Sequence, residues 1–250
     1  MRAPDWLTAR PIAHRGLHDP REGRIENSLS AAEAAAGAGL TIECDVQLTA
    51  DCEAVVFHDD ALGRLTEASG PVGEREAAAL GRLALAGTRD TIPTLATFLA
   101  VVADRVPVVV EVKSRFDGSL ALARRVAEVA AGMPCRVAVK SFDPDVVAAL
   151  QGLAPDLPRG VVAQSSYDGA EWAHLAPEAR HALANLLHVE TTRPHFLSWR
   201  VGDLPAAAPH LARVLGHLPV MAWTVRDEAA RRRARAHADQ MVFEGFRPDL

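Results

Sequence analysis

The sequence predicts an α/β fold in which eight parallel strands close into a barrel, and three observations support this prediction. Short apolar runs alternate with helix-like runs along the chain, which is the pattern of repeated βα units. The chain has 250 residues, 49% of them hydrophobic, which suits one large barrel domain over residues 1–250. The connection at residues 48–53 is too short for the crossover that parallel strands need, so a ninth strand is expected outside the barrel.

The expected strands are short and apolar. In chain order they cover residues 11–14, 41–46, 54–58, 107–113, 136–142, 160–164, 195–200, 219–225 and 240–244. The expected helices cover residues 28–37, 94–103, 119–131, 144–150, 172–187 and 227–237. Asn27 or Ser28 can cap the first helix, and Asp143 followed by Pro144 is a typical helix start.

Residues 41–58 are expected to form a β-hairpin, because their connection allows only an antiparallel pair. A pairing of Gln47 with Ala54 would place His58 opposite Glu43. Residues 59–93 interrupt the alternation with several glycines and one short helix near residues 74–80. They predict an elaborated loop or small cap over the barrel mouth.

Composition limits the classes of function. The formal net charge of −5 argues against broad nucleic-acid binding, which needs a basic face. No apolar run approaches the ~20 residues of a membrane span, and residues 1–10 lack the apolar run of a signal peptide, so we expect no stable membrane insertion and a cytoplasmic protein. Three cysteines, an odd number without metal-ligand spacing, argue against a disulfide framework. The oligomeric state cannot be predicted.

Carboxylates stand at strand ends where a simple core would have apolar residues. Side chains alternate faces along a strand, so Glu43 and Asp45 point the same way, and Glu111 and Lys113 repeat this spacing on another strand. Three carboxylates from two strands suit a hard divalent cation with oxygen ligands. A single pair could be a structural salt bridge, but the full set favours a metal site.

Two histidines and several cations also lie at strand ends. His14 and His58 are suited to general acid–base catalysis, because an unperturbed imidazole titrates near pH ~6.5. Arg15 and Lys113 could neutralise phosphoryl oxygens. Lysine occurs only at Lys113 and Lys140 among the 27 basic residues, and both close a strand, which favours a role for the compact ammonium group.

Several short motifs occur in a fixed order from about residue 11 to the C-terminus. They are His14-Arg15-Gly16, Glu26-Asn27-Ser28, Glu43-Cys44-Asp45-Val46-Gln47-Leu48-Thr49, Val55-Val56-Phe57-His58-Asp59-Asp60, Ile92-Pro93-Thr94-Leu95, Glu111-Val112-Lys113, Ser141-Phe142-Asp143-Pro144, Trp223-Thr224-Val225 and Arg247-Pro248-Asp249-Leu250. The ordered set resembles the glycerophosphodiester phosphodiesterase family.

The resemblance implies a TIM-type barrel and the hydrolysis of small-molecule glycerophosphodiesters to an alcohol and glycerol 3-phosphate. It implies one divalent cation, Mg²⁺ or Ca²⁺, with the ligands Glu43, Asp45 and Glu111. It also implies the following roles: His14 and His58 as the acid–base pair, Arg15 and Lys113 on the phosphate, Trp223 on the glycerol side, Glu26 near or behind the metal ligands, and Asn27 as the cap of the next helix.

Several positions depart from the family pattern, including Ala61 where Thr is more usual. Cys52 stands where the hairpin turn usually has glycine, so a positive φ there would cost energy and could expose the thiol. Glu244 lies on the last strand, where the family tends to have Asp before Arg-Pro, which puts a role for that strand in doubt. Lys140 replaces a small or polar residue, and it could contact phosphate or form a structural ion pair.

Two residues and two other functions stay open. His18 follows the first strand and could touch substrate, and Asp59 could orient His58 or, with a slight preference, hold the loop. Lysophospholipase D-like and sphingomyelinase D-like enzymes share the barrel and act on lipid headgroups, but few large apolar residues in 59–93 favour a soluble substrate. A barrel that binds phosphodiesters without turnover is disfavoured, because no expected ligand or histidine is missing.

Overall fold

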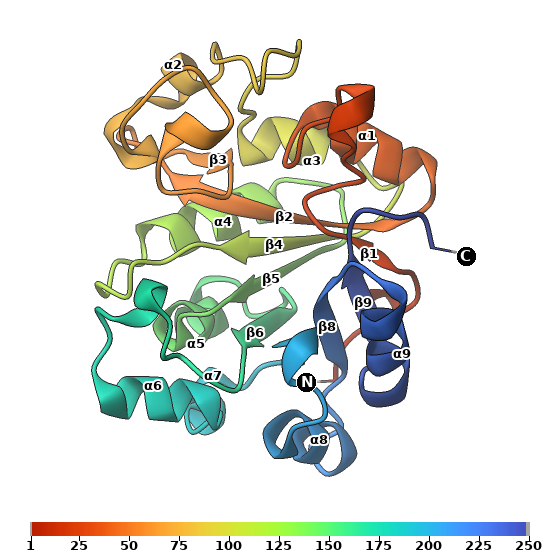
Figure 1. Cartoon of the computed structure of the whole chain (residues 1–250). Coiled ribbons are helices and arrows are strands. Elements are labelled where there is room, and N and C mark those ends of the chain that lie inside the picture. The colour runs from red at the N-terminus through yellow and green to blue at the C-terminus, as the bar shows by residue number, and fades with distance from the viewer. Residues whose placement is uncertain (1, 249–250) are drawn as a thin grey trace.

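Apolar, β-branched runs form a closed barrel in the computed structural model, which describes residues 2–248. Eight parallel strands close because the first strand pairs with both the second and the last (Figure 1). These strands are β1 (Ile12–Ala13), β2 (Thr41–Leu48), β4 (Val108–Val112), β5 (Val137–Ser141), β6 (Arg159–Ala163), β7 (Phe196–Arg200), β8 (Val220–Val225) and β9 (Gln240–Phe243). The predicted fold class is therefore confirmed.

Helices cover the outside of the barrel. They are α1 (Leu29–Gly37), α3 (Leu95–Val102), α4 (Ala121–Ala131), α5 (Pro144–Leu153), α6 (Pro177–Ala184), α7 (Val189–Thr192), α8 (Ala207–Val214) and α9 (Glu228–His237). Short 3-10 turns lie in the loops: η1 (Asp5–Leu7), η2 (Pro20–Glu22), η5 (Ala170–Trp172) and η6 (Val201–Asp203). Side-chain caps hold several helix starts, including Asp143, which accepts a hydrogen bond from the Asp145 amide.

Two helix predictions were wrong. The single helix expected over 172–187 is divided, because Pro177 starts α6 after a loop, and the chain turns again before α7. The helix α8 was missed, because Pro209 within its first turn resembles a loop signal in the sequence.

Alternation along the strands separates an outer core from the barrel interior. On β4, Val108, Val110 and Val112 pack outward in the main hydrophobic cluster, whereas Val109 packs inward. The inward cluster closes the lower barrel with Leu7, Ile12, Val109, Ala138, Phe196, Met221 and Val242. The next inward positions, two residues further along β4 and β5, are Glu111 and Lys140. The barrel interior therefore has an apolar layer and, next to it toward the carboxyl ends of the strands, a layer of polar side chains.

The predicted hairpin is present, but its predicted register was wrong by one residue. The strand β3 (Ala54–Val56) lies outside the barrel and pairs antiparallel with β2, with Leu48 opposite Ala54. The shift arises because residues 50–52 form a three-residue loop that ends at Cys52 in the left-handed region, with φ of 61°. His58 therefore does not stand opposite Glu43, and it lies beyond the end of β3.

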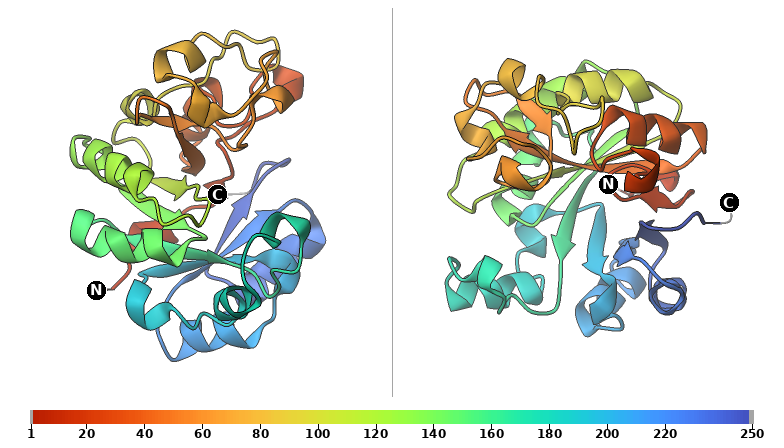
Figure 2. Two further views of the ribbon diagram at one scale, coloured as in Figure 1. Left: turned by 90° about the vertical axis from the view of Figure 1, so that its left-hand side faces the viewer. Right: turned by 45° about the horizontal axis from the view of Figure 1, so that its top comes forward.

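Residues 59–93 form the expected small cap, but most of it lies beside β3 rather than over the barrel mouth (Figures 1 and 2). The cap contains η3 (Leu62–Arg64), η4 (Val72–Glu74) and the short helix α2 (Ala77–Leu80). It has its own apolar cluster, formed by Ile25, Val55, Phe57, Leu62, Val72, Leu80, Leu85 and Ile92. This cluster fixes the cap against the outside of the hairpin. Among residues 2–248, no helix combines the length and apolar composition needed to cross a bilayer.

Candidate active site

Three buried carboxylates meet inside the upper barrel. Glu43 and Asp45 point inward from β2, and Glu111 points inward from β4, where the strand register sets it beside Asp45. One oxygen from each of the three lies within 4.8 Å of the others. The predicted set is thus brought together, and its oxygens could hold a hard divalent cation.

Two lysine ammonium groups share these carboxylates. Lys113 Nζ lies 2.7 Å from Asp45 Oδ1 and 2.5 Å from Glu111 Oε1. Lys140 Nζ lies 2.9 Å from Glu43 Oε1 and 3.0 Å from Glu111 Oε2. Burial alone would raise the pKa of Glu111, but the charges of Lys113 and Lys140 outweigh it and lower this pKa to about 2. Of the two readings of Lys140, the structure shows the ion pair.

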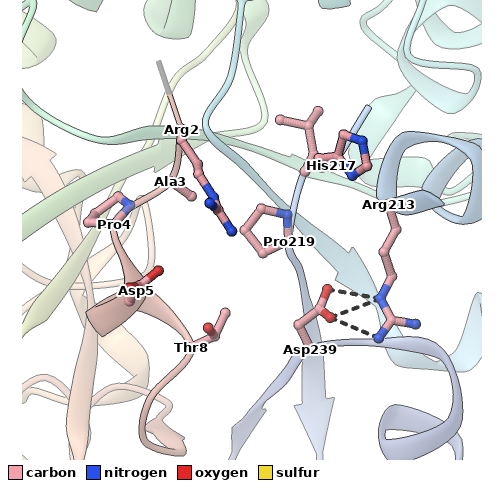
Figure 3. A pocket seen from close by; sticks show the side chains of 10 residues that line it. Arg2, Ala3, Pro4, Asp5, Thr8, Arg213, His217, Pro219 and Asp239 are labelled. Carbon is pink, nitrogen blue, oxygen red and sulfur yellow. Dashed lines mark hydrogen bonds and ion pairs between the residues drawn. The ribbon is translucent and has the colours of Figure 1, made fainter. Parts of the chain in front are cut away.

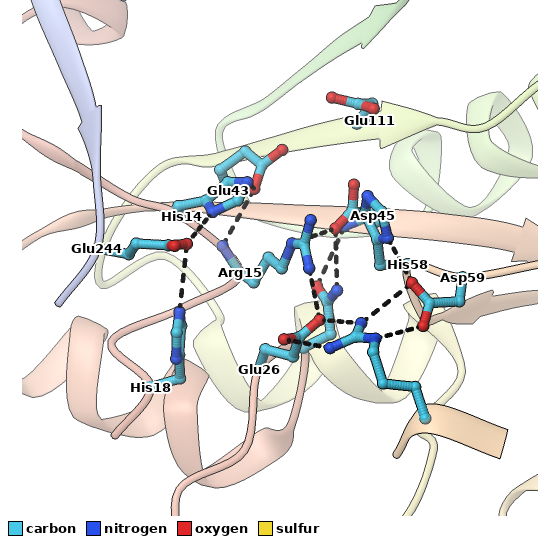
Figure 4. A network of polar contacts seen from close by, with 12 residues as sticks. His14, Arg15, His18, Glu26, Glu43, Asp45, His58, Asp59, Glu111 and Glu244 are labelled. Atoms are coloured by element: carbon cyan, nitrogen blue, oxygen red, sulfur yellow. Dashed lines mark hydrogen bonds and ion pairs between the residues drawn. The ribbon is translucent and has the colours of Figure 1, made fainter. Parts of the chain in front are cut away.

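A polar network supports Asp45 from the loop after β1 (Figure 4). Arg15 Nε lies 3.2 Å from Asp45 Oδ2, and Arg15 Nη1 donates to Glu26 Oε1 over 2.6 Å. Asn27 donates from Nδ2 to Asp45 Oδ2 over 3.0 Å and accepts from the Asp45 amide over 3.1 Å. Asn27 does not cap α1, because Ser28 accepts the capping hydrogen bond from Ala31. That expectation for Asn27 was wrong, and its amide is used to hold Asp45.

His58 lies at one side of the carboxylate cluster, beside Asp45 (Figure 4). Its Nδ1 is 2.7 Å from Asp59 Oδ1, so Asp59 contacts the imidazole directly. Arg64 of the cap donates to Asp59 and, over 3.0 and 2.7 Å, to Glu26. Asp59 therefore both contacts His58 and ties the loop to the cap, so neither of its two expected roles excludes the other.

His14 lies at the other side of the cluster, beside Glu43 (Figure 4). Its Nε2 is 4.0 Å from Glu43 Oε2, and its Nδ1 forms a hydrogen bond with Glu244 Oε2. His18 Nε2 lies 3.6 Å from the same Glu244 oxygen. Sequence reasoning named Glu244 only as a departure from the Asp of the family pattern and gave it no role. Its position directly after the last strand, which closes on β1, was the available signal.

A cavity of about 1060 Å³ opens at the carboxyl ends of the strands, over Glu111 and Lys113. One part of its wall is aromatic, with Phe116, Phe142 and Trp172. Trp223 packs edge-on against Phe142 with ring centroids 5.6 Å apart, and its indole donates to the Ser198 carbonyl. It packs against the inward cluster of the barrel and is not among the residues that line this cavity.

A second cavity, of about 620 Å³, lies at the opposite end of the barrel near the N-terminus (Figure 3). Its polar lining includes Asp239, which already pairs with Arg213. Barrel enzymes carry their active sites at the carboxyl ends of the strands, so the first cavity is the candidate active site.

The fold and site together define a parallel-barrel enzyme with an acidic, histidine-flanked centre at the barrel mouth. A family model described as the glycerophosphoryl diester phosphodiesterase family matches residues 14–243, and the chain belongs to this family. It is a glycerophosphodiester phosphodiesterase, an enzyme that hydrolyses phosphoric diesters.

Named relatives agree with this assignment. The chain is 26% identical over 228 residues to YhdW of Bacillus subtilis (strain 168), whose assigned name is that of a glycerophosphodiester phosphodiesterase, covering 87% of this chain and 86% of YhdW. An Oleispira antarctica phosphodiesterase solved with the product sn-glycerol-3-phosphate has the same fold, with a TM-score of 0.75, 22% identity and coverage of 95% and 94%. A glycerophosphodiester phosphodiesterase from Thermotoga maritima also has this fold, with a TM-score of 0.69 and 24% identity. The match covers 93% of this chain and 92% of the Thermotoga chain.

Proposed function

We propose that the chain hydrolyses glycerophosphodiesters to an alcohol and glycerol 3-phosphate with the help of one divalent cation and two histidines. The main observation in support of this proposal is that three buried carboxylates meet between His14 and His58 at the barrel mouth (Figure 4). A barrel interior without a chemical role would have apolar side chains at these inward positions. The neighbouring inward layer of this barrel is apolar in that way.

The carboxylates fit a hard cation. Glu43, Asp45 and Glu111 supply the oxygen donors that Mg²⁺ and Ca²⁺ prefer, within 4.8 Å of one another. When bound, the cation would polarise a phosphoryl oxygen and neutralise charge that develops on it. Lys113 can turn its ammonium from the carboxylates to the phosphate, because its side chain is 21% exposed at the cavity.

The two histidines lie on different sides of the carboxylates, as a proton-transfer pair requires. One imidazole takes the proton of the attacking hydroxyl, and the other gives a proton to the leaving alkoxide. Both water and the neighbouring glycerol hydroxyl are suitable attackers in this scheme. Arg15 neutralises the phosphoryl oxygens together with Lys113, and Trp223 supports the aromatic wall on the glycerol side.

The histidine roles are tested by His14→Ala and His58→Ala in an assay of glycerol 3-phosphate release from glycerophosphocholine. We expect kcat to fall by about 10²–10⁴-fold in each, the usual contribution of general acid–base catalysis. His210→Ala, at an exposed position on α8, is the matched control and should retain full activity. Retention of more than about a tenth of the rate in either active-site variant would refute the assignment, because it lies outside that range.

A lipid headgroup is the second candidate substrate, as in lysophospholipase D-like enzymes. The aromatic wall formed by Phe116, Phe142 and Trp172 favours it, since an acyl chain could lie against apolar rings. Lysophosphatidylcholine and glycerophosphocholine, compared by kcat/KM, separate the two candidates. We expect the soluble diester to be the better substrate.

We also propose a cytoplasmic location. Cys44, Cys52 and Cys135 are all unpaired, which suits a reducing compartment.

A further inference from the structure

Both candidate catalytic histidines have the same arrangement behind them. In each case Nδ1 contacts a carboxylate, and an arginine side chain donates a hydrogen bond to that same carboxylate. For His58 the carboxylate is Asp59, which Arg64 contacts. For His14 the carboxylate is Glu244, whose Oε1 accepts a 2.6 Å hydrogen bond from Arg226 Nε. Two unrelated parts of the chain thus build the same order of groups around two imidazoles.

The arrangement around His14 depends on the closure of the barrel. The strand β9 pairs with β1 in a register that sets Phe243 beside Ala13, and the His14 amide donates to the Phe243 carbonyl over 2.9 Å. The next residues, His14 and Glu244, are therefore neighbours although 230 positions separate them. The Glu244 amide donates to the Val225 carbonyl, which fixes the backbone of Glu244 as well.

Glu244 is kept ionised. Partial burial alone would raise its pKa, but the hydrogen bond from His14, the nearby His18 imidazole and the hydrogen bond from Arg226 hold the pKa of Glu244 well below its usual range. A carboxylate at Nδ1 fixes the tautomer and the rotation of an imidazole, and it stabilises the imidazolium that forms when the other nitrogen takes a proton.

We propose that Glu244 is the positioning residue of His14. It accepts the Nδ1–H hydrogen bond, so that Nε2 faces Glu43 and the reacting phosphodiester. In the step the proton moves between Nε2 and the substrate oxygen, while Nδ1–H stays on the imidazole and Glu244 remains a carboxylate. This inference rests on the proposed function of His14, and it gives the last strand a role that the sequence pattern does not indicate.

A purely structural role for Glu244 makes a different prediction. Glu244 also contacts His18 and Arg226, so it could merely tie the end of β9 to the neighbouring loops. Such a tie would affect the unfolding temperature in any background. A positioning role would affect kcat only while His14 is present.

The experiment is a double-mutant cycle with glycerophosphocholine as substrate. We expect Glu244→Ala to lower kcat by about 10–100-fold with little change in KM, the scale found when the partner behind a functional histidine is lost. Glu244→Gln, whose amide oxygen can still accept from Nδ1–H, should lose less. In the His14→Ala background, Glu244→Ala should lower kcat no further. Glu33→Ala, which removes an exposed ion pair with Arg105, is the matched control.

A spectroscopic measurement separates orientation from stability. In protein labelled with ¹⁵N-histidine, the His14 signals should report Nδ1–H in the wild type and a mixture of tautomers in Glu244→Ala. Unchanged kcat in folded Glu244→Ala, an unchanged His14 tautomer, or an equal loss in the His14→Ala background would overturn the proposal. If His14→Ala alone is fully active, the proposed function fails instead, and the two failures are therefore distinguishable.

Discussion

Lys140 is a buried cation within a site that is expected to hold another cation. Its side chain is 3% exposed, and its ammonium lies between Glu43 and Glu111. With Lys113 and Arg15 it balances the three carboxylates, so the cluster is close to neutral before any ion binds. Lys113 can move toward the cavity, whereas Lys140 is enclosed. Lys140 should therefore stabilise the metal-free protein and weaken its hold on the metal.

Lys140→Met tests this trade-off. Removal of one partner from a buried ion pair costs about 3–5 kcal/mol, so in chelator the variant should unfold at a clearly lower denaturant concentration. Its affinity for Mg²⁺ or Ca²⁺ should rise at least about tenfold, since positive charges a few Å apart repel by several kcal/mol inside a protein. Calorimetric titration measures the affinity. Arg105→Met, which breaks an exposed pair, should change neither quantity appreciably, and equal metal affinity in Lys140→Met would contradict the prediction.

The sequence predicted site residues that lie on strands, because alternation determines the face to which each side chain points. Glu43, Asp45 and Glu111 could be grouped in this way before the fold was known. Arg64 and Glu244 could not. Arg64 comes from the irregular cap, where no periodicity indicates direction, and the contact of Glu244 depends on how the last strand pairs with the first.

The hairpin between β2 and β3 contains a local conflict between sequence and backbone. Cys52 is exposed and adopts φ of 61°, a left-handed conformation that favours glycine. The sequence indicated the turn and its strain, but it did not indicate the register, since a two-residue or a three-residue loop could join the same strands.

Cys52→Gly should stabilise the protein. Removal of the left-handed strain should gain about 1–2 kcal/mol, and the greater freedom of glycine in the unfolded chain offsets about 0.4–1 kcal/mol of this. We expect a net gain of about 0.5–1 kcal/mol in the free energy of unfolding, measured by denaturant titration. Cys52→Ala keeps the strain and is the control. Equal stability of the glycine and alanine variants would argue against strain at this turn.

Arg64 connects the cap to the barrel mouth, and its contribution should depend on pH. In the folded protein the pKa values of Glu26 and Asp59 are lowered, because hydrogen bonds and charge from Arg64, joined by Arg15 at Glu26 and by His58 at Asp59, outweigh the opposing effect of burial. A lowered folded pKa stabilises at pH above the unfolded value, near ~4, and this stabilisation is lost as pH falls below it.

Arg64→Gln should therefore be less stable than the wild type at pH 7, and the difference should shrink as pH falls through the lowered pKa values of Glu26 and Asp59. Because Arg64 is 45% exposed, solvent screening limits the difference to about 1 kcal/mol. Urea titrations across this pH range measure it. A difference that stays constant or grows toward acid pH would show that Arg64 acts through packing alone.

At the scale of the molecule, closure of the sheet brings the segments that follow the first and last strands to one site. The loop after β1 carries His14 and Arg15, and the segment after β9 carries Glu244, while β2 and β4 supply the carboxylates beside them (Figure 1). Strand number and a closed parallel barrel followed from the sequence, because alternation, length and one short connection left few arrangements. The residue pairing between β1 and β9, which closes the barrel, could not be predicted, because no local sequence pattern indicates it.

The central claim is that the carboxylate cluster hydrolyses glycerophosphodiesters with a bound divalent cation. Its most direct test is the rate of glycerol 3-phosphate release from glycerophosphocholine by chelator-treated protein, before and after addition of Mg²⁺ or Ca²⁺. We predict that the treated wild type loses nearly all turnover and recovers it on addition of one of these ions, whereas Glu111→Gln does not recover. Full turnover in the continued presence of chelator, or full recovery in Glu111→Gln, would contradict the account.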